Sequence, residues 1–140
     1  MRKIVIASHG DFSKGLLSSI EMIVGKQENI KTYSLYPGET PEQFTKEVEE
    51  EILKNKEDEF IIMTDLLGGS VHTAMTSLCK FKNIHLISGV SLNLALEILT
   101  NLDEEDLEET IKNALSVNLE QITYILSNNI KVEEGEEEIW

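Results

Sequence analysis

The protein has 140 residues, and 12 basic against 26 acidic side chains give it a formal net charge of −14. A hydrophobic fraction of 41% and a charged fraction of 27% are typical of one folded globular domain and argue against extensive disorder. The acidity argues against nucleic acid or anionic lipid as partners, because both are recognised by basic surfaces.

The single cysteine, Cys79, excludes an internal disulfide framework. The apolar run near the amino terminus is too short for a secretory signal, and no segment approaches the roughly 20 apolar residues of a membrane span. We therefore expect a cytoplasmic protein.

Strand and helix patterns alternate along the chain. Short continuous apolar runs predict strands that are covered on both faces, and apolar residues three or four apart predict amphipathic helices. We expect strands at 4–7, 30–35, 60–63 and 84–87. A helix follows each of the first three strands: one ending at Gly25, one capped by Thr40, and one capped by Ser70 and ending near Phe81. Two more helices follow the fourth strand, one from Ser91 or Leu92 and one from Asp103 whose apolar side reaches Leu126. A further short strand is expected at 130–132, so residues 1–128 form a single domain and 129–140 a terminal strand with an acidic tail.

This alternation predicts an α/β fold, with an open, mostly parallel sheet of strand order 2-1-3-4 and helices on both faces. In that order strands 1 and 3 are neighbours, and ligands of such sheets bind beyond the carboxyl ends of the strands, where the winding reverses. His9 leaves the first strand and Asp65 leaves the third. The sequence therefore predicts a histidine and an aspartate side by side at this point of the sheet.

A paired histidine and aspartate suggest nucleophilic chemistry. Asp65 bonded to one ring nitrogen of His9 would leave the other nitrogen as a positioned nucleophile, and would stabilise the cationic ring formed on attack. Gly69 and Ser70 follow in a glycine loop at a helix start, where main-chain N–H groups and a hydroxyl suit a phosphate. Together these parts indicate phosphoryl transfer through a phosphohistidine. The sequence carries no nucleotide-binding fingerprint, and we expect no cofactor.

Two other histidines have simpler interpretations. His72 is interpreted as a surface residue of a helix and His85 as a structural residue of a strand. A metal site built from His9, Asp65, His72 and Cys79 has no known ligand spacing to support it, so no metal is expected.

Four short motifs, taken together, make the chain similar to a known family. They are Ser8-His9-Gly10, Pro37-Gly38-Glu39, Asp65 with Gly68-Gly69-Ser70, and Ser88-Gly89-Val90. Over residues 4–126 the chain resembles the enzyme IIA component of the mannose class (mannose, fructose and sorbose) of the phosphoenolpyruvate-dependent sugar phosphotransferase system, the PTS. The specific feature is the joint spacing of the four motifs.

The resemblance implies a phosphotransferase that acts in sugar uptake. His9 would accept phosphate from the phosphocarrier protein HPr, at the ring nitrogen not bonded to Asp65, with Gly69 and Ser70 assisting phosphate binding. The phosphate would pass to a separate IIB protein, which phosphorylates sugar during import through the membrane subunits IIC and IID. The resemblance also implies a homodimer that exchanges a carboxyl-terminal strand, for which residues 130–132 are the candidate.

The chain departs from the family pattern in two places. Val71-His72-Thr73 stands where the family usually has Pro-Phe-Asn, and Ser91 and Asn93 stand where it favours Asn and Pro. We expect these changes to leave the phosphate-accepting residues intact and to alter the rim that a partner contacts.

Other functions remain open at this point. The phosphotransfer subunit of a dihydroxyacetone kinase shares the fold and the histidine, but its phosphate goes to a nucleotide held by a kinase partner. A regulatory module would sense phosphorylation without passing the phosphate on, and a small-anion binding domain would not be phosphorylated at all.

The acidity is concentrated away from the predicted site. Residues 103–140 carry 12 acidic and 2 basic side chains, whereas residues 1–102 carry 14 acidic and 10 basic ones. We interpret the acidic end as a solvated surface that aids solubility and steers a basic protein partner by long-range attraction.

Overall fold

The computed structural model describes residues 1–129 and contains one sheet of four strands in the order β2-β1-β3-β4. The strands are β1 (Arg2–His9), β2 (Ile30–Leu35), β3 (Glu59–Thr64) and β4 (Ile84–Ile87). All three pairings are parallel. The predicted strand order is therefore confirmed, with β1 and β3 at the centre of the sheet.

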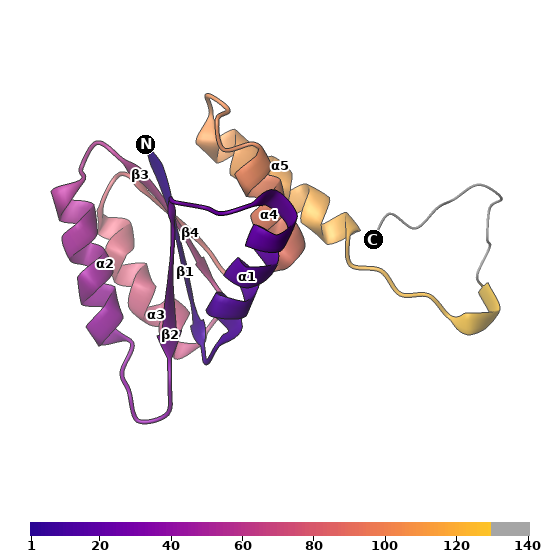
Figure 1. The fold of residues 1–140 in the computed structure, drawn as a ribbon, viewed down its shortest axis with the longest axis horizontal. Helices are drawn as coiled ribbons and strands as arrows, with labels where there is room; N and C mark the ends of the chain where they lie inside the picture. The colour runs from indigo at the N-terminus through magenta and orange to yellow at the C-terminus, as the bar shows by residue number, and fades with distance from the viewer. Residues whose placement is uncertain (130–140) are drawn as a thin grey trace.

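The helices cover both faces of this sheet, as expected (Figure 1). They are α1 (Phe12–Val24), α2 (Glu42–Lys54), α3 (Ser70–Met75), α4 (Leu92–Thr100) and α5 (Leu107–Glu120), with 3₁₀ turns at Thr76–Lys80 and Ser127–Asn129. Helices α1, α4 and α5 pack in one hydrophobic cluster, and α2 and α3 pack in the other. No helix of residues 1–129 is both long enough and apolar enough to cross a membrane.

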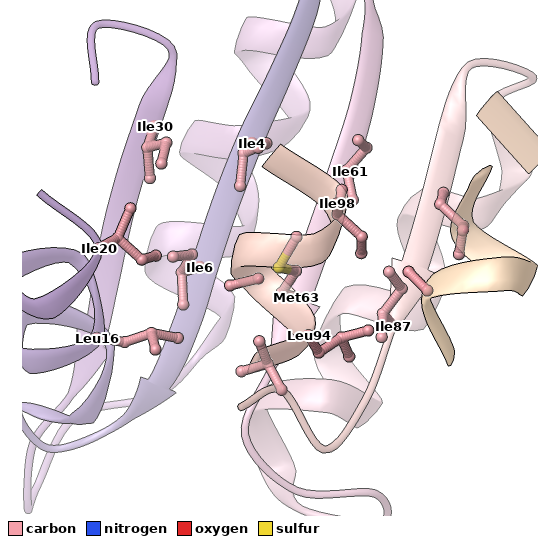
Figure 2. Packing of buried hydrophobic residues seen from close by; sticks show 14 of the residues in the cluster. Ile4, Ile6, Leu16, Ile20, Ile30, Ile61, Met63, Ile87, Leu94 and Ile98 are labelled. Carbon is pink, nitrogen blue, oxygen red and sulfur yellow. The ribbon is translucent and has the colours of Figure 1, made fainter. Parts of the chain in front are cut away.

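Residues of the central strands point alternately into the two clusters. Ile4 and Ile6 of β1 meet α1 and α4 on one face, as Figure 2 shows, whereas Val5 and Ala7 meet α2 and α3 on the other. Side chains alternate between faces in a strand, so a strand buried on both sides must be apolar throughout. Burial of each large side chain contributes about 2 kcal/mol of transfer free energy, and this packing holds the carboxyl ends of β1 and β3 in place.

The structure changes the expected beginnings of three helices. Helix α5 begins at Leu107 and is capped by Asp106, so the prediction of a start at Asp103 is wrong. Gly69, not Ser70, occupies the N-cap position of α3, and Ser70 is the first helical residue. Helix α2 begins at Glu42 after Pro41, with no side-chain capping bond within the described chain, so the prediction of Thr40 as its cap is wrong. Helix α4 begins at Leu92, one of the two starts that the sequence predicts, and Ser91 caps it: its Oγ accepts a hydrogen bond of 3.1 Å from the main-chain N–H of Leu94.

Two helices end earlier than their apolar patterns predict. Helix α3 ends at Met75, and the chain continues to Lys80 as a 3₁₀ turn. Helix α5 ends at Glu120, and the apolar residues after it are exposed, including Ile122 at 75%. Figure 1 shows this segment leading away from the sheet and its helices. The strand predicted at 130–132 lies outside the described residues.

Candidate functional site

His9 is the last residue of β1, at the carboxyl edge of the sheet between β2 and β3. In β3, Thr64 pairs with Ala7, and Asp65 leaves that strand beside His9. The chain turns away from His9 through Gly10, whose φ of 57° is a left-handed conformation that suits glycine. The two neighbouring parallel strands therefore deliver His9 and Asp65 to the same point, as the sequence predicts.

One oxygen of Asp65 accepts two hydrogen bonds from His9. The main-chain N and the ring Nδ1 of His9 each lie 2.8 Å from Asp65 Oδ2. A carboxylate only accepts, so Nδ1 carries the proton and Nε2 keeps its lone pair. On the other side of the ring, Ser70 Oγ lies 3.5 Å from Nε2. The free nitrogen is thus the one that faces Ser70.

The carboxylate and the ring differ strongly in their exposure to solvent. The side chain of Asp65 is 15% exposed and that of His9 is 47% exposed. The second carboxylate oxygen, Oδ1, is buried and accepts no hydrogen bond from residues 1–129. A largely buried carboxylate is screened less by water than an exposed one, so its attraction for a positive charge on the ring is stronger.

Gly69 lets the loop after β3 lie directly against the imidazole. A Cβ at position 69 would stand 3.2 Å from His9 Cε1 and 3.3 Å from the main-chain O of Leu66. Both distances are shorter than ordinary van der Waals contact. Gly68 turns the same loop with a φ of 79°. The glycine pair thus brings Ser70 to the ring.

A second polar cluster lies on the β2 side of the site. The hydroxyl of Tyr36, the residue after β2, donates to Asp11, and Lys14 Nζ donates to the Tyr36 hydroxyl at 2.8 Å. The hydrogen bond to Tyr36 raises the pKa of Lys14. Asp11 is exposed, and the bond to Tyr36 is a contact that the sequence pattern does not reveal.

The two other histidines are bonded to partners other than His9 and Asp65. The imidazole of His72 contacts Thr64, with 2.6 Å between Nδ1 and Oγ1, and His85 Nε2 lies 3.3 Å from a carboxylate oxygen of Glu59. Burial raises the pKa of the Cys79 thiol. Within residues 1–129, no three His, Cys, Asp or Glu side chains are arranged to hold a metal ion.

The three residues that stand where the family usually has Pro-Phe-Asn face three different surroundings. Val71 is completely buried in the cluster below α3, His72 is half-buried, and Thr73 is exposed. The expectation that all three alter the rim is therefore wrong for Val71, because a buried side chain cannot contact a partner.

Comparison with known proteins agrees with this geometry. Residues 3–115 match the family model EIIA-man, the PTS system fructose IIA component. A sorbose-specific EIIA component of the PTS from Klebsiella pneumoniae is 31% identical over 98 residues, which are 69% of this chain and 72% of that protein. A mannose-specific EIIAB component from Escherichia coli K12 is 29% identical over 104 residues, which are 73% of this chain and 32% of that protein.

A solved structure supports the same relationship. The crystal structure of the PTS component EIIA from Streptococcus agalactiae superposes with a TM-score of 0.78 at 28% identity, covering 89% of this chain and 97% of that one. The residues that match the family model, 3–115, include both His9 and Asp65. The chain therefore belongs to the mannose-class EIIA family of the sugar phosphotransferase system.

Proposed function

We propose that this protein is a phosphoryl carrier of sugar uptake that takes phosphate from phospho-HPr on Nε2 of His9 and passes it to a IIB protein. The observation that carries the proposal is the double hydrogen bond from His9 to Asp65 Oδ2, which leaves Nε2 as the free nucleophile. Membership of the EIIA family supports the same reaction class.

Each transfer exchanges one phosphorus–nitrogen bond for another. The lone pair of His9 Nε2 attacks the phosphorus atom of the donor phosphohistidine, and the bond from phosphorus to the donor nitrogen breaks. The His9 ring keeps its proton on Nδ1 and gains a bond at Nε2, so it becomes cationic. Asp65 stabilises this cation through a charge-assisted hydrogen bond, which is stronger than the bond to the neutral ring. The same steps in reverse deliver the phosphate to IIB.

Ser70 is the proposed phosphate-binding residue, together with the main chain at Gly69. Its Oγ is already 3.5 Å from Nε2, so a phosphoryl group on that nitrogen lies within reach of the hydroxyl. The hydroxyl then donates to a phosphoryl oxygen.

The surroundings of His9 favour a protein as phosphate donor. The ring is open to solvent, and the segments that follow His9 and Asp65 in the chain carry large exposed apolar side chains: Phe12, Leu66 and Leu67. Exposed apolar side chains beside a reactive group are typical of a protein-binding surface. HPr and IIB would therefore contact the same rim in turn, and the membrane subunits would receive phosphate only through IIB.

We also propose that the protein is a cytoplasmic homodimer. The cytoplasmic location follows from a donor that carries phosphate from phosphoenolpyruvate. The dimer is supported by the apolar side chains exposed along the end of α5 and the segment after it, which are Leu115, Leu119, Ile122, Tyr124, Ile125 and Leu126. A second copy of the chain would remove these side chains from water.

The test is phosphorylation in a defined mixture of phosphoenolpyruvate, enzyme I and HPr. One acid-labile phosphoryl group is expected on His9, located by mass spectrometry at neutral pH, followed by its loss when purified IIB is added. His9→Ala is the matched control and should take up none. Label that persists in His9→Ala overturns the proposal, and label on His9 that no IIB protein accepts supports a regulatory module instead.

A further inference from the structure

The loop that carries Asp65 and Ser70 is bridged at its base by a side-chain hydrogen bond. Thr64 precedes Asp65 by one residue, and His72 follows Ser70 by two. Thr64 Oγ1 lies 2.6 Å from His72 Nδ1 and 3.2 Å from the main-chain O of Ile87. Both candidate site residues of this loop therefore lie between the two ends of the bridge.

The direction of the two bonds follows from their chemistry. A carbonyl oxygen only accepts, so the Thr64 hydroxyl donates its one hydrogen to Ile87. The Oγ1 atom of Thr64 then accepts from His72 Nδ1–H. This relay uses the buried hydroxyl both as a donor and as an acceptor, and it ties α3 to the last residues of both β3 and β4.

Helix α3 has few other directional contacts that would set its position. It has six residues and, within the described chain, no side-chain capping bond. The preceding loop is exposed, with Leu67 at 73%, and is closed by a main-chain bond of 3.2 Å from Gly69 N to Leu66 O. Val71 holds the helix on the sheet by apolar packing, which is not directional.

We propose that His72 is a positioning residue for phosphoryl transfer: through Thr64 it holds the first turn of α3, and with it Ser70, in register with His9 Nε2. This inference rests on the proposed function and adds to it a residue that does not touch the phosphate. The gap between Ser70 Oγ and Nε2 is 3.5 Å, so a shift of about 1 Å in α3 would remove the hydroxyl from the phosphoryl group.

His72→Phe is the discriminating variant. A phenyl ring fills the same space without a nitrogen, and Thr64 keeps its bond to Ile87, so no buried polar group loses its last partner. His72→Asn is the matched control, because its side-chain amide places a donor near the position of Nδ1. At saturating phospho-HPr we expect roughly a tenfold lower transfer rate for His72→Phe, a KM within about twofold of wild type, and a rate largely restored in His72→Asn.

A double-mutant cycle with Ser70→Ala separates positioning from a general loss of structure. If His72 acts through Ser70, His72→Phe has almost no further effect on the transfer rate in the Ser70→Ala background. The proposal is overturned if His72→Phe transfers phosphate at the wild-type rate. It is also overturned if the fold-loss of rate in the double variant equals the product of the two single fold-losses.

Amide hydrogen exchange tests the same proposal without any phosphate donor. Exchange at residues 69–72 should be at least about tenfold faster in His72→Phe than in wild type, and close to wild type in His72→Asn. Unchanged exchange in His72→Phe overturns the positioning role even if wild-type protein takes up no phosphate. A wild-type protein that takes up no phosphate would, by itself, contradict only the proposed function.

Discussion

His9 donates to Asp65 twice, once from its main chain and once from its ring, and both hydrogen bonds end on the same carboxylate oxygen. The main-chain bond does not depend on the ring, so it holds the carboxylate in place whatever the chemical state of the ring. The ring bond then sets which nitrogen is free. The position of the carboxylate and the choice of ring nitrogen are thus secured by separate contacts.

Asp65→Asn removes the negative charge while keeping the size of the side chain. The amide oxygen takes the place of Oδ2, because an NH₂ there would point at the main-chain N–H of His9, so Nε2 stays free and what is lost is the charge that stabilises a cationic ring. We expect a fall on the order of 100-fold in the rate of phosphate uptake from phospho-HPr, measured by rapid quench. Asp103→Asn, the same change on an exposed loop between α4 and α5, should stay within about twofold. Similar rates for Asp65→Asn and wild type would contradict the role of Asp65.

Gly69→Ala tests whether the loop must lie against the imidazole. The added Cβ would stand 3.2 Å from His9 Cε1 and 3.3 Å from the O of Leu66, so the ring or the loop has to move. We expect roughly a tenfold lower transfer rate and a loss of about 1 kcal/mol in the free energy of unfolding, measured with urea.

Gly15→Ala is the matched control for this change. Gly15 lies inside α1 and a Cβ there meets nothing within 4 Å. Alanine should raise the free energy of unfolding by about 0.5–1 kcal/mol and leave transfer unchanged. A transfer rate in Gly69→Ala equal to that of Gly15→Ala would show that the close approach at position 69 does not matter.

Ser91 joins α4 to α5 as well as capping α4. Its Oγ accepts from Leu94 N at 3.1 Å and donates to Asn118 Oδ1 at 2.9 Å. Ser91→Ala loses both bonds and should lower the free energy of unfolding by about 1–2 kcal/mol. Asn118→Ala removes only the second bond, so it should lower the free energy of unfolding by less than Ser91→Ala does. The difference between the two losses measures the contribution of the cap. Equal losses in the two variants would mean that the cap contributes nothing.

The strand order and the pairing of His9 with Asp65 were predictable because both depend on patterns that the sequence carries directly. Two apolar runs buried on both faces become neighbouring parallel strands, and the residue that ends each run is then fixed to the same edge. The contact between Thr64 and His72 was not predictable, because it joins a strand to a helix whose rotation about its axis is set by packing.

The ends of α3 and α5 show a different limit of prediction. Val71, Met75 and Leu78 are buried along one side of the chain, and a 3₁₀ turn buries Leu78 as well as a continued α-helix would. After α5 the apolar pattern continues through Ile122, although nothing in residues 1–129 covers that side chain. An apolar period shows which face avoids water, not what covers the face or where the helix ends.

The exposed apolar residues after Ala114 should form the contact between two copies of the chain. Leu119→Glu combined with Ile122→Glu places charges on this surface, and burial of an unpaired charge is strongly unfavourable. Sedimentation equilibrium should find a dimer for wild type and a monomer for the double variant. Met22→Glu, on the exposed side of α1, is the control and should stay dimeric. A wild-type monomer at tens of micromolar would contradict the dimer.

The acidic end of the chain should speed the encounter with the phosphate donor. Charges attract a basic partner over roughly 10 Å at 0.1 M salt and over about 3 Å at 1 M, so kcat/KM for uptake from phospho-HPr should fall about tenfold between these conditions. The rate at saturating donor should change little, because the short bond between His9 and Asp65 is hardly screened. Replacing the glutamates of residues 133–138 by glutamine should flatten the salt dependence and lower kcat/KM at low salt. If kcat/KM does not change with salt in either the wild type or the glutamine variant, the acidic end does not attract the donor and contributes only to solubility.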